Sequence, residues 1–137
     1  MDKLTEIMAW KRREIAERIR KVGEAELQSS RYPDRAGSFL KALQAPKGLA
    51  VISEIKRRSP SAGEIKTIES AATQAMAYAQ AGADCLSILT DEKYFGGTMA
   101  DLESSRQQLC EIGFETPCLR KDFMSHPIPV LEAANAG

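Results

Sequence analysis

The stretch Leu49-Ala50-Val51-Ile52-Ser53-Glu54-Ile55-Lys56 begins as an apolar run and ends with an acid and a base. A short apolar run of this kind after a glycine is typical of a buried strand. Residues two apart on a strand point to the same face, so we expect Glu54 and Lys56 to act together. Because isolated charges in a buried place are costly, the two residues either form a salt bridge or serve a ligand.

Strands and helices alternate three times from this point onward. The sequence predicts further strands over 83–90 and 117–121, and helices over 68–81, 99–112 and 127–136. Apolar strands separated by helices indicate parallel strands joined by right-handed crossovers, and therefore an α/β fold. Two architectures stay open on this pattern alone: a doubly wound open sheet and a (β/α)8 barrel.

The residues before the first strand predict a helical extension. Apolar residues recur at helical intervals over 3–28, which indicates one long amphipathic helix. We expect a loop over 29–36, and a short helix that Ser38 caps and that ends before Pro46. The region from residue 1 to residue 48 is thus predicted to be an extension, and residues 49–137 form the α/β part.

Composition and charge restrict the partners. The chain has 137 residues, of which 43% are hydrophobic, as expected for a globular domain with a core. Basic and acidic residues both number 19, so the net charge is zero, which favours small molecules over nucleic acid or anionic membranes. No segment has the length or order of a membrane span or a signal peptide, so we expect a cytoplasmic protein. Cys85, Cys110 and Cys118 lack metal-ligand spacing and are expected to be buried free thiols.

The charged residues favour the barrel over the open sheet. Neither GxGxxG nor GxxxxGK[ST] occurs, so dinucleotide and P-loop nucleotide binding have no support. Charges instead end the first strand, at Glu54 and Lys56, and the third strand, at Lys121. In a barrel, the active site lies at the carboxyl ends of the strands. We therefore expect Lys56 and Lys121 to face the same pocket mouth.

Three motifs, in this order along the chain, resemble the indole-3-glycerol phosphate synthase family. Residues 52–63, Ile-Ser-Glu-Ile-Lys-Arg-Arg-Ser-Pro-Ser-Ala-Gly, resemble its first-strand motif. Its second strand and the following loop are similar to residues 87–97, Ser-Ile-Leu-Thr-Asp-Glu-Lys-Tyr-Phe-Gly-Gly. Its third strand is similar to residues 119–123, Leu-Arg-Lys-Asp-Phe. The resemblance implies a (β/α)8 barrel of roughly 250 residues, of which this chain holds the extension and the first three βα units.

The resemblance implies a carbon–carbon lyase of tryptophan biosynthesis that needs no metal or cofactor. Its phosphosugar substrate, 1-(2-carboxyphenylamino)-1-deoxyribulose 5-phosphate, loses carbon dioxide and water to give indole-3-glycerol phosphate. Lys121 would be the general acid of ring closure, and Lys56 would hold the substrate carboxylate and assist proton transfer. Glu54 would orient or deprotonate beside Lys56. A cationic acid suits this step because ring closure places electrons on a ketone oxygen.

The resemblance also implies three substrate-binding residues. Ser59, expected in a turn ahead of a helix, would donate to the phosphate, although an ordinary turn serine is the simpler interpretation. Phe95 and Phe123 would line the pocket for the aromatic ring, or pack in the core. His126, at the start of a predicted helix, is expected to be a surface residue without a catalytic role.

Two other functions stay open on the sequence. The chain could be a folding or interaction module without catalysis, whose unpaired strand edges promote self-association. It could also belong to another phosphosugar barrel, such as phosphoribosylanthranilate isomerase, which would not require Glu54, Lys56 and Lys121 together. We expect the 137 residues alone to be inactive, because strands four to eight are expected beyond Gly137.

Overall fold

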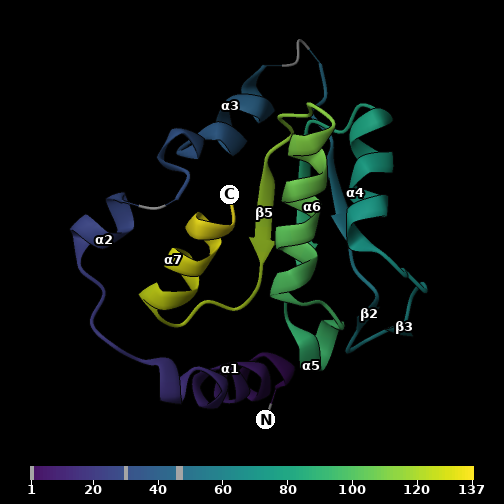
Figure 1. Ribbon diagram of the computed structural model, residues 1–137. Coiled ribbons are helices and arrows are strands. Elements are labelled where there is room, and N and C mark those ends of the chain that lie inside the picture. The colour runs from purple at the N-terminus through teal and green to yellow at the C-terminus, as the bar shows by residue number, and fades with distance from the viewer. Residues whose placement is uncertain (1, 30, 46–47) are drawn as a thin grey trace. The chain divides into compact units, whose positions relative to one another are not determined.

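The structure is a computed structural model that describes residues 2–29, 31–45 and 48–137 (Figure 1). The predicted loop residue Ser30 and the predicted helix-ending segment 46–47 lie outside these ranges. Of the described helices, none has both the length and the apolar character that crossing a membrane requires.

The contacts of the chain divide it into two compact units. One unit consists of Met1–Asp34 and Asp122–Gly137, and the other consists of Arg35–Lys121. The sequence predicts a different division, with a helical extension up to residue 48 and an α/β part after it. That division stays a prediction.

The unit Arg35–Lys121 is built on a parallel sheet. Strands β1 (Ile52–Ile55), β4 (Cys85–Leu89) and β5 (Cys118–Lys121) pair in the order β1-β4-β5. This confirms the predicted α/β class with parallel strands. Within the described part of the chain the sheet has three strands and is not a closed barrel.

The burial of the strands follows their place in the sheet. All five residues of the central strand β4 are buried. The first strand is an edge strand and alternates: Ile55 is 2% exposed, whereas Ile52 is 48% exposed. The prediction of a buried strand from residue 49 to residue 56 is therefore wrong in length and in burial. An apolar run alone does not distinguish an edge strand, with one neighbour, from a central strand, with two.

Two helices of this unit pack together alongside the strands. Helix α4 (Ala71–Gln80) contacts helix α6 (Met99–Glu111), and both contact β4 (Figure 1). The buried face of α4 consists of alanines, which lets the two helices approach closely. Helix α4 begins at residue 71 rather than at 68, because the Ser70 side chain accepts the Thr73 N–H and caps it there.

The short helix α3 (Ser38–Gln44) belongs to the same unit. Its N-cap is Gly37, whose φ of 74° is left-handed, so the predicted capping role of Ser38 is wrong. Ser38 is the first helical residue instead. The Cys85 thiol on β4 donates to the Phe39 carbonyl at 3.7 Å, so α3 contacts the face of the sheet on which Cys85 lies.

Residues 3–28 form two helices and a 3-10 turn, so the single helix predicted over this range is wrong. Helix α1 (Lys3–Glu14) leads into η1 (Ala16–Arg18), and α2 (Glu24–Gln28) follows after an extended segment. Most helical stability comes from burying an apolar face, and Ile19 is 53% exposed. A continuous helix would therefore gain little burial beyond η1.

Helix α7 (Pro127–Ala136) has the predicted bounds. His126 is its N-cap, and the ring Nδ1 accepts the Ile128 N–H at 3.2 Å. The sequence analysis predicted no catalytic role for His126 but missed this structural one. Within the same unit, the Glu132 carboxylate pairs with Arg18, and the Asn135 side chain accepts the Arg31 N–H at 3.0 Å.

Candidate active site

A cluster of three polar side chains lies at the end of β1 and in the middle of β4. The Lys56 ammonium is 3.0 Å from Glu54 Oε1, and the Ser87 hydroxyl donates to Glu54 Oε2 at 3.2 Å. The two charged side chains are about one third exposed, at 34% and 35%, whereas Ser87 is 5% exposed. Both oxygens of the carboxylate are thus held, and the cluster remains open to a ligand. The predicted placement of Glu54 and Lys56 on one face is confirmed by this contact, and their catalytic role stays a prediction.

Ser87 is a site residue that the sequence analysis missed. The register of the parallel pair places Glu54 opposite Ser87, so the two side chains share one face of the sheet. A serine in the middle of a fully buried strand was the available signal, because a buried hydroxyl needs a hydrogen-bond partner.

The position of Lys121 follows from the same register. Leu89 is opposite Lys121, and the register extended by one residue past Ile55 and Ile88 places Lys56 opposite Leu89 as well. Two strand spacings put the Cα atoms of the two lysines roughly 10 Å apart on one face. Lys121 is exposed, and among residues 2–29, 31–45 and 48–137 no carboxylate forms an ion pair with it. The register supports a shared site for the two lysines, which stays a prediction.

Ser59 lies in a small hairpin that the sequence analysis missed. Strands β2 (Arg58–Ser59) and β3 (Gly63–Glu64) pair antiparallel, each over two residues, which is too short for a detectable alternation. The Ser59 oxygen accepts the Ala62 N–H at 3.1 Å. Ser59 is the last residue of β2, so the turn begins after it rather than containing it, and the helix ahead, α4, begins at residue 71. A hydroxyl that accepts one hydrogen bond can still donate its own proton.

Arg57 joins the loop after β1 to the loop after β4. Its guanidinium donates to both carboxylate oxygens of Asp101, at 2.7 and 2.9 Å, and to the carbonyls of Ile68 and Gly96, at 3.0 and 3.2 Å. Burial alone would raise the pKa of Asp101, but its hydrogen bond and charge interaction with Arg57 lower the pKa overall. This ion pair holds both loops in place beside the cluster.

The loop after β4 contains a one-turn helix, α5 (Glu92–Phe95), that fixes the backbone of Phe95. The buried Asp91 side chain accepts the N–H groups of Tyr94 at 2.7 Å and of Phe95 at 3.3 Å. A Cβ atom on Gly97 would lie 1.8 Å from the Leu89 carbonyl oxygen, so only glycine fits there.

Phe95 and Phe123 belong to different compact units, and each is half-buried. Their predicted role, the two walls of a pocket for an aromatic ring, stays a prediction. Cys85 is buried, as predicted, but Cys110 is exposed and Cys118 is half-buried, so the prediction that all three thiols are buried is wrong. No set of three or more His, Cys, Asp or Glu side chains in the described ranges is arranged to hold a metal ion.

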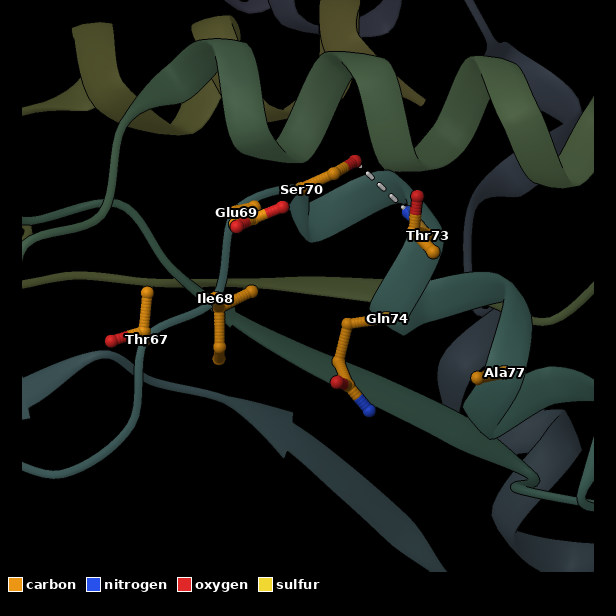
Figure 2. Close-up of a pocket in the computed structure, with 7 residues that line it drawn as sticks. All are labelled: Thr67, Ile68, Glu69, Ser70, Thr73, Gln74 and Ala77. Carbon is orange, nitrogen blue, oxygen red and sulfur yellow. Dashed lines mark hydrogen bonds between the residues drawn. The ribbon is translucent and has the colours of Figure 1, made fainter.

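A surface hollow of about 420 Å³ lies at the start of α4 (Figure 2). Figure 2 shows that the Ser70 hydroxyl there is already engaged with Thr73 N. None of the predicted site residues lines it. Its walls consist of Thr67, Ile68, Glu69, Ser70, Thr73, Gln74 and Ala77.

A parallel sheet with an acid and bases at the carboxyl ends of its strands is the arrangement expected of part of a (β/α)8-barrel enzyme. Residues 4–137 match the protein family described as indole-3-glycerol phosphate synthase. The chain belongs to the indole-3-glycerol phosphate synthase family, as the three motifs indicated.

Curated relatives agree with this assignment. A protein of Opitutus terrae named indole-3-glycerol phosphate synthase is 58% identical over 138 residues, which cover 99% of this chain and 52% of the relative. Proteins of the same name from Parafrankia sp. and Acidithiobacillus ferrooxidans are 42% and 43% identical, and the matches cover 49% and 51% of their lengths. The chain therefore spans about half the length of the curated relatives it matches.

Proposed function

We propose that the complete protein containing this chain is an indole-3-glycerol phosphate synthase. It converts 1-(2-carboxyphenylamino)-1-deoxyribulose 5-phosphate to indole-3-glycerol phosphate, with loss of carbon dioxide and water, as a cytoplasmic carbon–carbon lyase of tryptophan biosynthesis. The observation that carries the proposal is the Glu54–Lys56 pair at the carboxyl edge of the sheet, in register with Lys121. This arrangement occurs in a chain of that family.

Ring closure is the step that needs a cationic acid. An aromatic carbon of the substrate attacks its ketone carbon, and the electrons of the C=O bond move to the oxygen. Lys121, exposed at the end of β5, donates a proton to that oxygen. Lys56 binds the substrate carboxylate until it leaves as carbon dioxide, because an ammonium holds a carboxylate by a charge-assisted hydrogen bond.

Glu54 is the base of the cluster. Its carboxylate is held by Lys56 on one oxygen and by Ser87 on the other, so its orientation toward the substrate is fixed before binding. When the ring loses water, a base must take a proton while an acid assists the departing hydroxyl. Glu54 beside Lys56 supplies both kinds of group at one place.

The remaining predicted residues bind the two ends of the substrate. Ser59 donates to the phosphate from the hairpin that Arg57 holds against the loop after β4. Phe95 and Phe123 contact the aromatic ring of the small phosphosugar substrate. Aromatic side chains offer a large apolar surface for such a ring.

Turnover by a complete chain tests this proposal. Joining residues 1–137 to the part of the Opitutus terrae relative that they do not cover gives a polypeptide of full family length. We expect this fusion to form indole-3-glycerol phosphate, and Lys121→Ala to lower kcat by about 10²–10⁴-fold. Lys41→Met, an exposed lysine on α3, is the control and should leave kcat unchanged. Near-normal kcat in Lys121→Ala would refute the assigned acid.

The same assay separates the neighbouring enzyme class. A phosphoribosylanthranilate isomerase would convert its own phosphosugar without releasing carbon dioxide, so release of carbon dioxide by the fusion is the distinguishing signal. We expect the 137 residues alone to release none. Turnover by the unfused chain would contradict that expectation and would require a different set of catalytic groups.

We also propose that the 137-residue chain self-associates through the edge of β1. Leu49 is 95% exposed, and Val51 and Ile52 are about half exposed, at 50% and 48%. An apolar strand edge of this kind recruits another strand. Sedimentation velocity at increasing concentration should show dimers or larger species, and Val51→Lys should reduce them. A monomer at all concentrations would contradict this proposal.

A further inference from the structure

The extension contains a buried cation that the proposed reaction does not use. Lys11 on α1 is 4% exposed, and its ammonium pairs with the carboxylates of Glu14 and Asp122. The distance from Lys11 Nζ to Asp122 Oδ1 is 3.0 Å, and the Asp122 side chain is 2% exposed. All three residues lie in the compact unit formed by Met1–Asp34 and Asp122–Gly137.

A second ion pair on α1, between Lys3 and Glu6, differs from the Lys11 pair in its exposure. Lys3 and Glu6 pair at 2.7 Å with side chains that are 54% and 45% exposed, and surface pairs of this kind contribute little to stability. Lys11 is different, because a buried charge that loses its partner is strongly unfavourable. Burial alone would lower the pKa of Lys11, but its hydrogen bonds to Glu14 and Asp122 raise it above the usual value.

One carboxylate oxygen connects Lys11 to a predicted substrate-binding residue. Asp122 Oδ1, which pairs with Lys11, also accepts the backbone N–H of Phe123 at 2.8 Å. The ammonium therefore holds the oxygen that in turn holds the backbone of Phe123. Rotation of the Asp122 side chain would break both interactions at once.

We propose that Lys11 and Asp122 are positioning residues that set the orientation of Phe123 for the aromatic ring of the substrate. The inference rests on the proposed function, because it takes Phe123 as part of the binding site. Neither residue needs to touch the substrate. The helical extension thereby contributes to substrate affinity, through a residue that no sequence motif marks.

The first arm of the test uses the 137-residue chain and needs no substrate. Amide hydrogen exchange at Phe123 is measured in the wild type, Lys11→Met, Lys11→Arg and the control Lys3→Met. We expect exchange at least about tenfold faster in Lys11→Met, because the acceptor of the Phe123 N–H loses its anchor. Lys11→Arg keeps a cation and should stay near the wild-type rate, as should Lys3→Met. An unchanged rate in Lys11→Met would overturn the proposal.

The second arm measures kinetics in the fusion with the Opitutus terrae relative. Lys11→Met should raise KM about tenfold, with kcat within about twofold. The reason is that a misplaced Phe123 ring makes weaker contacts with the bound substrate, and aromatic contacts contribute about this much to affinity. Asp122→Asn should raise KM similarly, and the double variant should be no worse than the worse single variant. Lys11→Arg should restore KM.

Separate outcomes distinguish this inference from the proposed function. A wild-type fusion without turnover would contradict the proposed function, and the exchange arm would then decide whether Lys11 positions Phe123. Turnover with an unchanged KM in Lys11→Met would overturn the positioning role alone. A fall in kcat that tracks a fall in melting temperature, without recovery in Lys11→Arg, would show a purely structural ion pair and would also overturn it.

Discussion

Two neighbouring basic residues, Lys56 and Arg57, form ion pairs that have different roles. Lys56 pairs with Glu54 through one contact of 3.0 Å, and both side chains are about one third exposed. Arg57 pairs with Asp101 through two contacts, and those side chains are 23% and 15% exposed. Consecutive residues of an extended chain point to opposite faces, so one basic residue reaches the open face and the next reaches the loops.

The two pairs differ in how much hydrogen-bonding capacity each leaves for a ligand. The Arg57 guanidinium also donates to two backbone carbonyls, which leaves little of its donor capacity for a ligand. The Glu54–Lys56 pair keeps exposed surface and unused donors on the ammonium. A ligand can therefore compete for the Glu54–Lys56 pair but not for the Arg57–Asp101 pair.

The greatest loss of stability is predicted for a substitution at Gly97, in the loop that supports the site. Gly97→Ala places a Cβ atom 1.8 Å from the Leu89 carbonyl oxygen, and the backbone of β4 would have to move. We expect a loss of about 4 kcal/mol or more in the free energy of unfolding, measured by urea titration. Gly113→Ala is the matched control: it has left-handed φ but open space, and should cost only about 1–2 kcal/mol. Equal losses would contradict the close approach at Gly97.

The next effect is the loss of the Arg57 partner. Asp101→Ala removes a partly buried carboxylate that accepts two charge-assisted hydrogen bonds and completes the capping box of α6. We expect a loss of about 2–4 kcal/mol in the free energy of unfolding. Glu103→Ala, an exposed acid on the same helix, should change it by less than about 0.5 kcal/mol. A loss below about 1 kcal/mol in Asp101→Ala would show that Arg57 does not depend on Asp101.

The same pair predicts an acid dependence of stability. The folded pKa of Asp101 lies below its usual value of 3.8, so its stabilising effect is present above pH 3.8 and is lost as pH falls through the folded value. The difference in unfolding free energy between wild type and Asp101→Asn should therefore shrink below pH 3.8. A difference that stays constant from neutral pH to the acid transition would contradict the assigned pKa direction.

The smallest effect on stability is expected on the open face. Glu54→Gln keeps the shape of the side chain and removes one third-exposed ion pair, so the free energy of unfolding should change by less than about 1 kcal/mol. Thermal unfolding compared with Asp101→Asn gives the contrast directly. If Glu54→Gln destabilises the chain more than Asp101→Asn, the roles of the two pairs are reversed.

The sequence predicted helices α6 and α7 best, because Gly113 and Pro127 mark the end of one and the start of the other. Helix α7 has the predicted bounds, and α6 ends one residue early, at Glu111. The prediction of one long helix in the extension failed because the apolar periodicity of the sequence continues past η1, whereas the burial of the apolar residues does not. The exposed Ile19 shows this. The β2–β3 hairpin was too short to carry a pattern.

The candidate site was predictable as far as it depends on residues close in sequence. Glu54 and Lys56 share a face because they are two apart, which the sequence states directly. Ser87 joins them only through the register between β1 and β4. The pairing of Lys11 with Asp122 joins the two ends of the chain, and no local pattern encodes it.

The most direct test compares kcat and stability in Lys56→Met and Arg57→Met of the fusion protein. If the Glu54–Lys56 pair is catalytic, Lys56→Met should lower kcat by at least about a hundredfold. Its free energy of unfolding should stay within about 1 kcal/mol of the wild-type value. Arg57→Met should show the larger loss of stability. A Lys56→Met enzyme with near-normal kcat would contradict the assignment of the Glu54–Lys56 pair to catalysis.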